Sequence, residues 1–425
     1  MNPQEYIESH GKFGIRLGLE NIKILLSHLG NPQNTLKFIH VGGTNGKGST
    51  CTMLESIFRT CGYTTGLYTS PALMDFGERI RLNNQSIQDS ILGEVLEQIK
   101  EAEKKMMADG HPQPTCFEIE TALALLFFHL NKVDICIMEV GMGGRLDATN
   151  IIPPPLLTII TTISYDHTQY LGDTLQAIAE EKAGIIKSGT TLILHPQMQE
   201  AYQVFDKKCA KLNVKLVVVP KDGVVSLPPS QNITQEMKIK FWDGEIIEHG
   251  LLGTYQSNNT AGVLLAVEIL SQIFPKLSKD GTKKALESVR FPGRFEILQK
   301  NPIILIDGAH NLGGIESFIS SYQTYFDNQP MNLFFGMLED KEIIQSLQQL
   351  LPLTQSVYTL TPQNERAIHS KEMAKLIEDE FGIHAHICSD SQEALQIAKQ
   401  SPPNSINAFI GSLYLIGEIR KAYYN

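Results

Sequence analysis

A glycine-rich segment near the N-terminus follows a short apolar run, opens a helical pattern and constrains the fold more than any other feature. The run Lys37-Phe-Ile-His-Val41 leads into Gly42-Gly-Thr-Asn-Gly-Lys-Gly-Ser49. A strand, a glycine loop and a helix in this order place backbone N–H groups and a helix N-terminus around an anion, and Lys47 adds a charge for the outer phosphates. Gly48 breaks the strict G-x-x-x-x-G-K-[ST] pattern, so the segment predicts a variant phosphate loop. A glycine-rich turn without a ligand is the alternative.

Strand-like apolar runs alternate with helical periods through the first half of the chain. This alternation is typical of βαβ units around a mostly parallel sheet. Residues that follow such strands collect at the carboxyl edge of the sheet, where open α/β folds bind their ligands. We expect strands at residues 37–41, 133–140 and 156–163, and a helix at residues 174–183.

Short β-rich pieces replace this alternation between about residues 214 and 253. Pro228-Pro229 and Asp243-Gly244 separate them, which predicts a small antiparallel insertion or edge from residues 215–219, 237–242 and 245–249. A helix is expected at residues 258–273, and Phe291-Pro-Gly-Arg294 then breaks the pattern.

We place a domain boundary at this break. It predicts a phosphate-loop α/β domain over residues 1–295 and a smaller, Rossmann-like α/β domain over residues 296–425. In the second domain we expect strands at residues 302–306, 332–335 and 356–360 and a helix at residues 371–380.

Composition excludes several classes of protein. The 425 residues carry 36 basic and 46 acidic side chains, a formal charge of −10 that leaves little room for the basic face of a nucleic-acid-binding protein. The six cysteines form no C-x-x-C pair, which is typical of a reduced protein. The N-terminus lacks a basic and apolar leader, and the longest apolar run is too short to span a membrane. We expect a cytoplasmic protein.

A second glycine loop, Glu139-Val-Gly-Met-Gly-Gly-Arg145, follows another buried run. Gly141-x-Gly-Gly144 resembles a weak dinucleotide fingerprint, but three prolines follow shortly afterwards instead of a helical pattern, so a nicotinamide site is the less favoured reading. Glu139 lies near a strand end, where a carboxylate can hold Mg²⁺ against phosphates. Pairing of Glu139 with Arg145 is the alternative.

Polar residues also follow two other predicted strands. Asp166-His167 comes after the run that ends at Ile163, and Asp307-Gly-Ala-His310-Asn311 comes after a run in the second domain. Both segments are expected at a carboxyl edge and are candidates for ligand binding. The alternatives are a structural role for His167 and a helix N-cap at Asn311.

These motifs together resemble the folylpolyglutamate synthase and dihydrofolate synthase family of the Mur ligase superfamily, over nearly the whole chain. The matching segments are Leu17-Gly-Leu-Glu20, His40–Thr50, Thr69-Ser-Pro71, Glu78-Arg-Ile80, Phe117-Glu118, Glu139–Asn150, Asp166-His-Thr168, Glu181–Ile186, Tyr255-Gln256 with Asn259, Pro292-Gly-Arg294, Asp307–Asn311 and Gly411–Leu415.

The resemblance implies a Mur-ligase-like fold and a set of site residues. It implies that ATP is held by Thr44, Asn45, Gly46, Lys47, Gly48, Ser49, Asn259, Arg294 and Asp307, and magnesium by Ser70, Glu139 and His167. It implies pterin-side contacts from Arg16, Leu17, Gly18, Leu19, Thr115, Cys116, Phe117, Glu118, Leu146, Asp147 and Ala148. It implies catalytic roles for Lys47, Lys182 and His310: Lys47 belongs to the loop that holds the triphosphate, the counterpart of Lys182 is carbamylated, and His310 matches a residue close to the phosphates. By composition alone Lys182 is a solvated lysine beside Glu180 and Glu181.

The implied reaction is ATP-dependent addition of L-glutamate to dihydropteroate, or to the glutamate tail of folates, through an acyl phosphate. Only some 40 residues precede Gly42, too few for the extra N-terminal domain of the cell-wall ligases, which favours the folate branch. The alternatives are another acid–amino-acid ligase of the superfamily, a P-loop ATPase without ligase activity, an oxidoreductase and a folate-binding protein without turnover. We expect a monomer that binds small molecules and neither nucleic acid nor membrane.

Overall fold

The computed structural model describes residues 2–14, 18–230, 233–339 and 341–425, which pack into two units. The first unit comprises Met1–Val224 and Asn258–Glu287, and the second comprises Val225–Ser257 and Ser288–Asn425. This division by packing differs in position from the expected boundary at residues 295 and 296, which stays a prediction.

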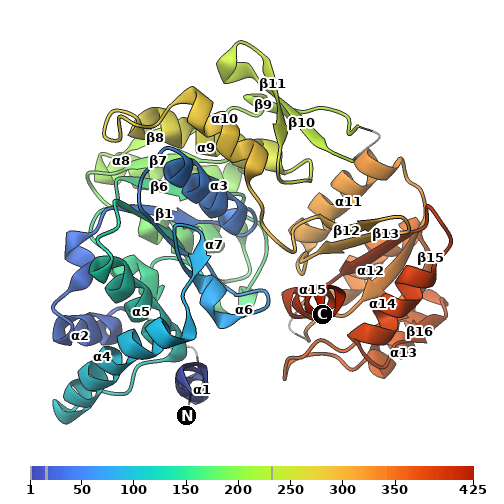
Figure 1. Ribbon diagram of the computed structural model, residues 1–425, viewed down its shortest axis with the longest axis horizontal. Coiled ribbons are helices and arrows are strands. Elements are labelled where there is room, and N and C mark those ends of the chain that lie inside the picture. Colours follow the sequence, from blue (N-terminus) through green and yellow to red (C-terminus); the bar gives the residue numbers. More distant parts are fainter. Residues whose placement is uncertain (1, 15–17, 231–232, 340) are drawn as a thin grey trace. The chain divides into compact units, whose positions relative to one another are not determined.

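An eight-stranded sheet forms the centre of the first unit (Figure 1). From edge to edge its strands are β4 (Gln85–Ser86), β3 (Ile80–Leu82), β2 (Thr65–Tyr68), β5 (Ile135–Glu139), β1 (Phe38–Gly42), β6 (Leu157–Ile160), β7 (Thr191–Leu194) and β8 (Lys215–Val218). All neighbours from β2 to β8 pair in parallel, and only β3 and β4 pair antiparallel. The predicted α/β class with a mostly parallel sheet is confirmed.

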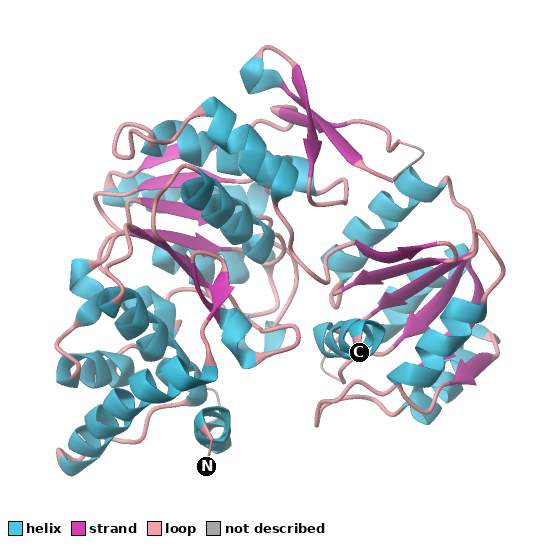
Figure 2. Cartoon of the chain, in the orientation of Figure 1, coloured by secondary structure: helices cyan, strands magenta, loops and turns pink. Residues whose placement is uncertain are grey.

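Helices cover both faces of this sheet (Figure 2). Successive side chains of a strand point to opposite faces of the sheet. In β1 both Phe38, which packs with the helices of one face, and its neighbour Ile39 are buried, so both faces must be covered. One face carries α5 (Cys116–Leu130), α7 (Leu175–Lys182) and α8 (Gln199–Leu212). The other carries α3 (Lys47–Thr60), with α9 (Gln256–Leu270) and α10 (Lys279–Ser288) bonded to α3. The remaining helices of this unit are α1 (Pro3–Glu8), α2 (Glu20–His28), α4 (Asp89–Ala108) and α6 (Thr168–Leu171).

The second unit holds two sheets. The smaller contains β11 (Glu245–His249), β10 (Gln235–Ile239) and β9 (Val224–Ser226), and β10 pairs antiparallel with β11. The larger has the order β12 (Glu296–Lys300), β13 (Ile303–Asp307), β17 (Ile406–Ile410), β14 (Met331–Phe335), β15 (Thr354–Thr359) and β16 (Ala385–Ile387). Its helices are α11 (Leu312–Phe326), α12 (Ile343–Leu350), α13 (Ser370–Phe381), α14 (Ser391–Gln400) and α15 (Leu413–Tyr424). Only β12 pairs antiparallel in this larger sheet, as in a Rossmann-like domain with an added edge strand.

One expectation for the middle of the chain is wrong in part. Residues 235–249 do form an antiparallel pair, but Lys215–Val218 joins the main sheet as its parallel edge strand, beside β7. The intervening helix α8 provides the crossover that a parallel connection requires. Within the described ranges, no helix combines the length and the apolar character needed to cross a bilayer.

Candidate active site

The phosphate loop connects β1 to α3 in the first unit. Gly43 and Gly46 have φ angles of 137° and 92°, which residues other than glycine rarely adopt. A Cβ on Gly43 would lie 1.8 Å from the Thr161 Oγ1 atom, so glycine is required there for space as well as for conformation. The loop is therefore a tightly packed turn at a helix N-terminus, as the sequence predicts, and its backbone N–H groups suit an anion.

The segment after β6 holds this loop in place. Thr44 donates its backbone N–H to the Thr162 carbonyl oxygen at 2.8 Å, and its hydroxyl donates to the Ser164 carbonyl oxygen at 3.1 Å. Ser164 returns its own N–H to that hydroxyl at 3.1 Å and accepts from Asn45 Nδ2 through its Oγ atom at 3.2 Å. Ser164 was not among the residues expected at the site. The signal that could have found it is the group of three small hydroxyl residues, Thr161, Thr162 and Ser164, that follows β6.

Two lysines contact the carbonyl groups of the loop. Lys47 Nζ donates to the Thr44 oxygen at 3.0 Å, and Lys182 Nζ, from the end of α7, donates to the Gly43 oxygen at 2.8 Å. Lys182 is buried, with 5% of its surface exposed, so its interpretation as a solvated lysine is wrong. Burial, followed by the charge of Lys47, lowers its pKa from 10.5 to about 7, against the opposing charges of Asp166 and Asp147.

Ser70 and Glu139 lie together at the carboxyl edge of the sheet. Glu139 ends β5 in register with Val41 of β1, and its Oε2 atom accepts from the Ser70 backbone N–H at 3.3 Å. A buried carboxylate with a nearby hydroxyl, beside the phosphate loop, is a donor set that fits Mg²⁺. Arg145, the alternative partner of Glu139, forms its ion pair with Glu181 at 2.6 Å.

His167 directly precedes the short helix α6 as its N-cap residue, in a left-handed conformation with φ at 49°. Its backbone N–H donates to Asp166 Oδ1 at 2.9 Å, and 37% of its side-chain surface is exposed. In the part of the chain that the structure describes, no three His, Cys, Asp or Glu side chains gather as a metal site. The predicted set contains only one carboxylate and one imidazole, so its third ligand would be the Ser70 hydroxyl.

The predicted pterin-side residues lie in three segments of the first unit, and Arg16 and Leu17 fall outside the described residues. Gly18 donates its N–H to the Leu146 oxygen at 3.4 Å, which brings two of the segments together. Thr115 caps α5, and the Glu118 carboxylate accepts from Thr115 N at 2.7 Å and from Asn21 Nδ2 at 3.2 Å. The remaining predicted residues are Leu19 before α2, Cys116 and Phe117 at the start of α5, and Asp147 and Ala148 beside Leu146.

The second glycine loop does not lead into an α-helix. Instead Asp147 caps the short 3-10 helix η4 (Ala148–Ile151), so the helix N-terminus of a dinucleotide fingerprint is missing there. The buried Asp147 carboxylate accepts from the Met142 and Thr149 N–H groups, both at 2.9 Å, and burial raises its pKa. A Cβ on Gly141 would lie 2.4 Å from the Phe117 ring, so Phe117 packs directly on this loop.

Arg294, Asp307 and His310 lie together in the second unit. Asp307 ends β13, and its carboxylate accepts from the Phe295 and Ala309 N–H groups at 2.7 Å each. Arg294 Nη1 donates to the Gly308 oxygen at 3.3 Å, and His310 Nδ1 contacts the same oxygen at 2.7 Å. Because a carbonyl oxygen only accepts, His310 carries its proton on Nδ1. Asn311 caps α11 through Gly314 N at 2.8 Å, which confirms the N-cap interpretation.

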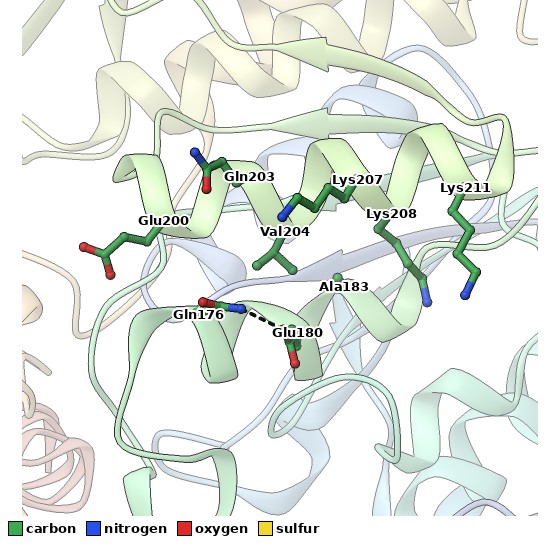
Figure 3. A pocket seen from close by; sticks show the side chains of 9 residues that line it. All are labelled: Gln176, Glu180, Ala183, Glu200, Gln203, Val204, Lys207, Lys208 and Lys211. Carbon is green, nitrogen blue, oxygen red and sulfur yellow. Dashed lines mark hydrogen bonds between the residues drawn. The ribbon is translucent and has the colours of Figure 1, made fainter.

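A groove of about 330 Å³ lies between α7 and α8 in the first unit (Figure 3). Lys207, Lys208 and Lys211 project from α8 along it, while Gln176 and Glu180 of α7 are joined by a hydrogen bond of 3.2 Å. None of the residues predicted to bind nucleotide, metal or pterin lines this groove.

Comparison with known proteins identifies the family. The Mur ligase middle domain matches residues 41–267, and the glutamate ligase domain of Mur ligases matches residues 293–413. A dihydrofolate synthase/folylpolyglutamate synthase of Bacillus subtilis is 34% identical over 98% of this chain and 97% of its own. The folylpolyglutamate synthase structure of Thermotoga maritima is 31% identical with a TM-score of 0.83, over 100% of this chain and 97% of that one. A folylpolyglutamate synthase complex with AMPPCP and folate is 29% identical with a TM-score of 0.83, over 100% of both chains. The chain therefore belongs to the folylpolyglutamate synthase and dihydrofolate synthase family of Mur ligases and is an ATP-dependent ligase.

Proposed function

We propose that this ligase joins L-glutamate to dihydropteroate, to the glutamate tail of folates, or to both. In the proposed reaction a carboxylate oxygen of the acceptor attacks the γ-phosphorus of ATP and releases ADP. The amino group of L-glutamate then displaces phosphate from the acyl phosphate and forms the amide. The single observation that supports this best is the phosphate loop, with Lys47 and the buried Lys182 amine bonded to its carbonyl groups.

Charge neutralisation is the main task in this chemistry, because two anions must approach each other in the first step. Lys47, which opens α3, supplies a positive charge beside the backbone N–H groups of Thr44–Ser49. We assign Asn259, Arg294 and Asp307 to nucleotide contacts, and His310 to a position close to the phosphates. These assignments follow the motifs of the family.

We assign Mg²⁺ to Ser70, Glu139 and His167. Glu139 supplies a carboxylate oxygen and Ser70 a hydroxyl, both at the sheet edge from which the phosphate loop departs. When bound, the ion would supply Lewis-acid stabilisation of the phosphate charge. We assign the pterin to the segments around Gly18, Phe117 and Asp147, which pack against the second glycine loop.

We also propose that Lys182 is carbamylated. Carbamylation requires the neutral amine, and burial together with Lys47 brings the pKa of Lys182 to about 7, so the neutral form is well populated near neutral pH. The lone pair of the neutral amine nitrogen attacks the carbon of carbon dioxide, one C–O π bond becomes the second oxygen's charge, and the nitrogen loses one proton, so a neutral amine becomes a negative, carboxylate-like group. The carbamate nitrogen keeps one N–H, which can still donate to the Gly43 oxygen.

The test is ADP release measured with and without L-glutamate and an acceptor, using dihydropteroate and tetrahydrofolate in parallel. The proposal requires that ADP release depends on an acceptor, with one glutamyl group added to the product per ADP. ADP release at full rate without glutamate or acceptor would indicate a P-loop ATPase instead. Mass spectrometry of the two products distinguishes the dihydrofolate and polyglutamate reactions. We further propose a cytoplasmic monomer that does not bind nucleic acid. Light scattering would test whether it is a monomer, and a gel-shift measurement would test for nucleic-acid binding.

A further inference from the structure

A fully buried histidine, His195, has no evident role in the fold or in the proposed reaction. It directly follows β7, donates its backbone N–H to the Ile160 oxygen at 2.9 Å, and exposes none of its surface. Neither ring nitrogen has a hydrogen-bond partner among the described residues. Burial lowers its pKa to about 4, so the ring is neutral. Burying an imidazole without hydrogen bonds destabilises the folded protein, so a histidine at this position calls for a reason. The contacts of its ring provide that reason.

The ring packs directly against the backbone of α9. A Cβ placed on Gly262 would lie 2.5 Å from His195 Nε2, whereas ordinary contacts begin at 3.4 Å. Gly262 lies in the interior of α9 with an ordinary helical φ, so its backbone conformation does not demand glycine. The close approach of the imidazole does. Glycine inside a helix lowers helix stability by about 1 kcal/mol relative to alanine. The close contact with the imidazole gives a reason for glycine at this position despite that loss.

One turn earlier on the same helix, Asn259 makes a second close approach. Its Oδ1 atom lies 2.5 Å from where a Cβ on Gly46 of the phosphate loop would be. Residues three apart share one face of a helix, so Asn259 and Gly262 lie on the same side of α9. Thr260, between them, donates to the Met53 sulfur of α3 at 3.6 Å. All these contacts lie within the first unit.

We propose that His195 is a positioning residue for nucleotide binding. Its ring contacts α9 at Gly262 and thereby fixes the position of the helix in which Asn259 packs against Gly46 of the phosphate loop. The ring touches no reacting group and acts through the helix. The inference rests on the proposed nucleotide contact of Asn259, and it adds His195 and Gly262 as residues that set the geometry of that contact.

A cycle of two substitutions tests this. Gly262→Ala adds a methyl group about 0.9 Å too close to the ring, so the fully buried ring or α9 must shift. In catalysis a misplacement of about 1 Å can cost about 100-fold in rate, and we expect a smaller loss in binding. We expect Gly262→Ala to weaken binding of AMPPCP at least tenfold. His195→Ala removes the ring and leaves α9 without its support, so we expect a loss of at least threefold. In the double variant the new methyl group occupies the vacated space, and binding should be tighter than in Gly262→Ala.

Gly281→Ala is the matched control. A Cβ on Gly281 of α10 would lie 2.5 Å from the Cys61 sulfur, the same close approach, but Cys61 follows the end of α3 opposite to Lys47. This variant should lower the melting temperature without changing AMPPCP affinity. Equal AMPPCP affinity in Gly262→Ala and Gly281→Ala, or no recovery in the double variant, would overturn the proposal. Should Gly262→Ala fail to fold, wild-type affinity in His195→Ala would overturn it as well.

AMPPCP binding is measured without glutamate or acceptor, so the result does not depend on the identity of the folate substrate. Asn259→Ala separates the two proposals. If Asn259→Ala binds AMPPCP as wild type does, the proposed nucleotide contact of Asn259 is wrong and the positioning role of His195 falls with it. If Asn259→Ala weakens binding while His195→Ala and Gly262→Ala do not, only the positioning role is wrong.

Discussion

Replacing Lys182 by methionine should stabilise the folded protein at neutral pH while abolishing ligation. A fall of the lysine pKa from 10.5 to about 7 corresponds to about 5 kcal/mol against the protonated amine. Methionine has a similar length and no charge, so Lys182→Met avoids that cost. Activity should be lost because the variant has no amine that could carry a carbamate.

The pH dependence makes this prediction specific. Between pH 7 and pH 10.5 the unfolded chain binds a proton on Lys182 that the folded chain releases, so the wild type gains stability as pH rises, by up to about 1.4 kcal/mol per pH unit. The stability advantage of Lys182→Met should therefore shrink by about 2 kcal/mol from pH 7 to pH 9. For a unit of this size, the difference in melting temperature between Lys182→Met and the wild type should therefore decrease by roughly 4–8 °C from pH 7 to pH 9.

The assay is thermal unfolding of both proteins at pH 7, 8 and 9 in buffers freed of carbon dioxide, since a carbamate would change the charge of the wild type. Lys207→Met serves as a control, because Lys207 is exposed on α8. If the difference in melting temperature between wild type and Lys182→Met is the same at pH 7, 8 and 9, burial does not disfavour the charged amine and the reasoning is refuted.

Four further substitutions and a rescue experiment test the site. Lys47→Ala should remove ligation and keep the wild-type melting temperature, because a loop cation contributes to phosphate binding and not to a core; a lowered melting temperature with normal turnover would contradict this. Glu139→Gln should raise the magnesium concentration for half-maximal turnover more than Ser70→Ala does, since a carboxylate is the stronger ligand, and the reverse order would mean that the metal is misplaced. Ser164→Ala loses the bond from Asn45 and should raise the KM for ATP about threefold to tenfold, with an unchanged KM speaking against its anchoring role. Lys182→Ala should be nearly inactive, and short carboxylic acids should restore part of its turnover. Absence of any rescue would contradict the carbamate assignment.

The phosphate loop and the strand ends could be predicted because their signals are local. Phe38–Gly42 and Lys47–Thr60 form the predicted strand and helix, and Glu139 is the last residue of its strand. Each of these follows from an apolar run, a glycine cluster and a helical period that lie next to one another in the sequence.

The environment of Lys182 could not be predicted in the same way. Two glutamates precede it, which is the pattern of a solvated helix end, yet its amine bonds to the Gly43 oxygen, 139 residues away in the sequence. The support of the loop by Ser164 and the contact of His195 with Gly262 also join distant segments. The pairing of Lys215–Val218 with β7 depends on how α8 packs, and its half-exposed residues give no periodic signal of a parallel strand.

The most direct test of the central claim follows the oxygen atoms of the acceptor carboxylate. If the carboxylate attacks the γ-phosphate, then an acceptor with both oxygens of that carboxylate labelled with heavy oxygen must pass one labelled oxygen to the released phosphate when glutamate displaces it. We predict one labelled oxygen in each phosphate formed, in a reaction that requires ATP, L-glutamate and the acceptor. Unlabelled phosphate accompanying full amide formation would contradict the acyl-phosphate account of this ligase.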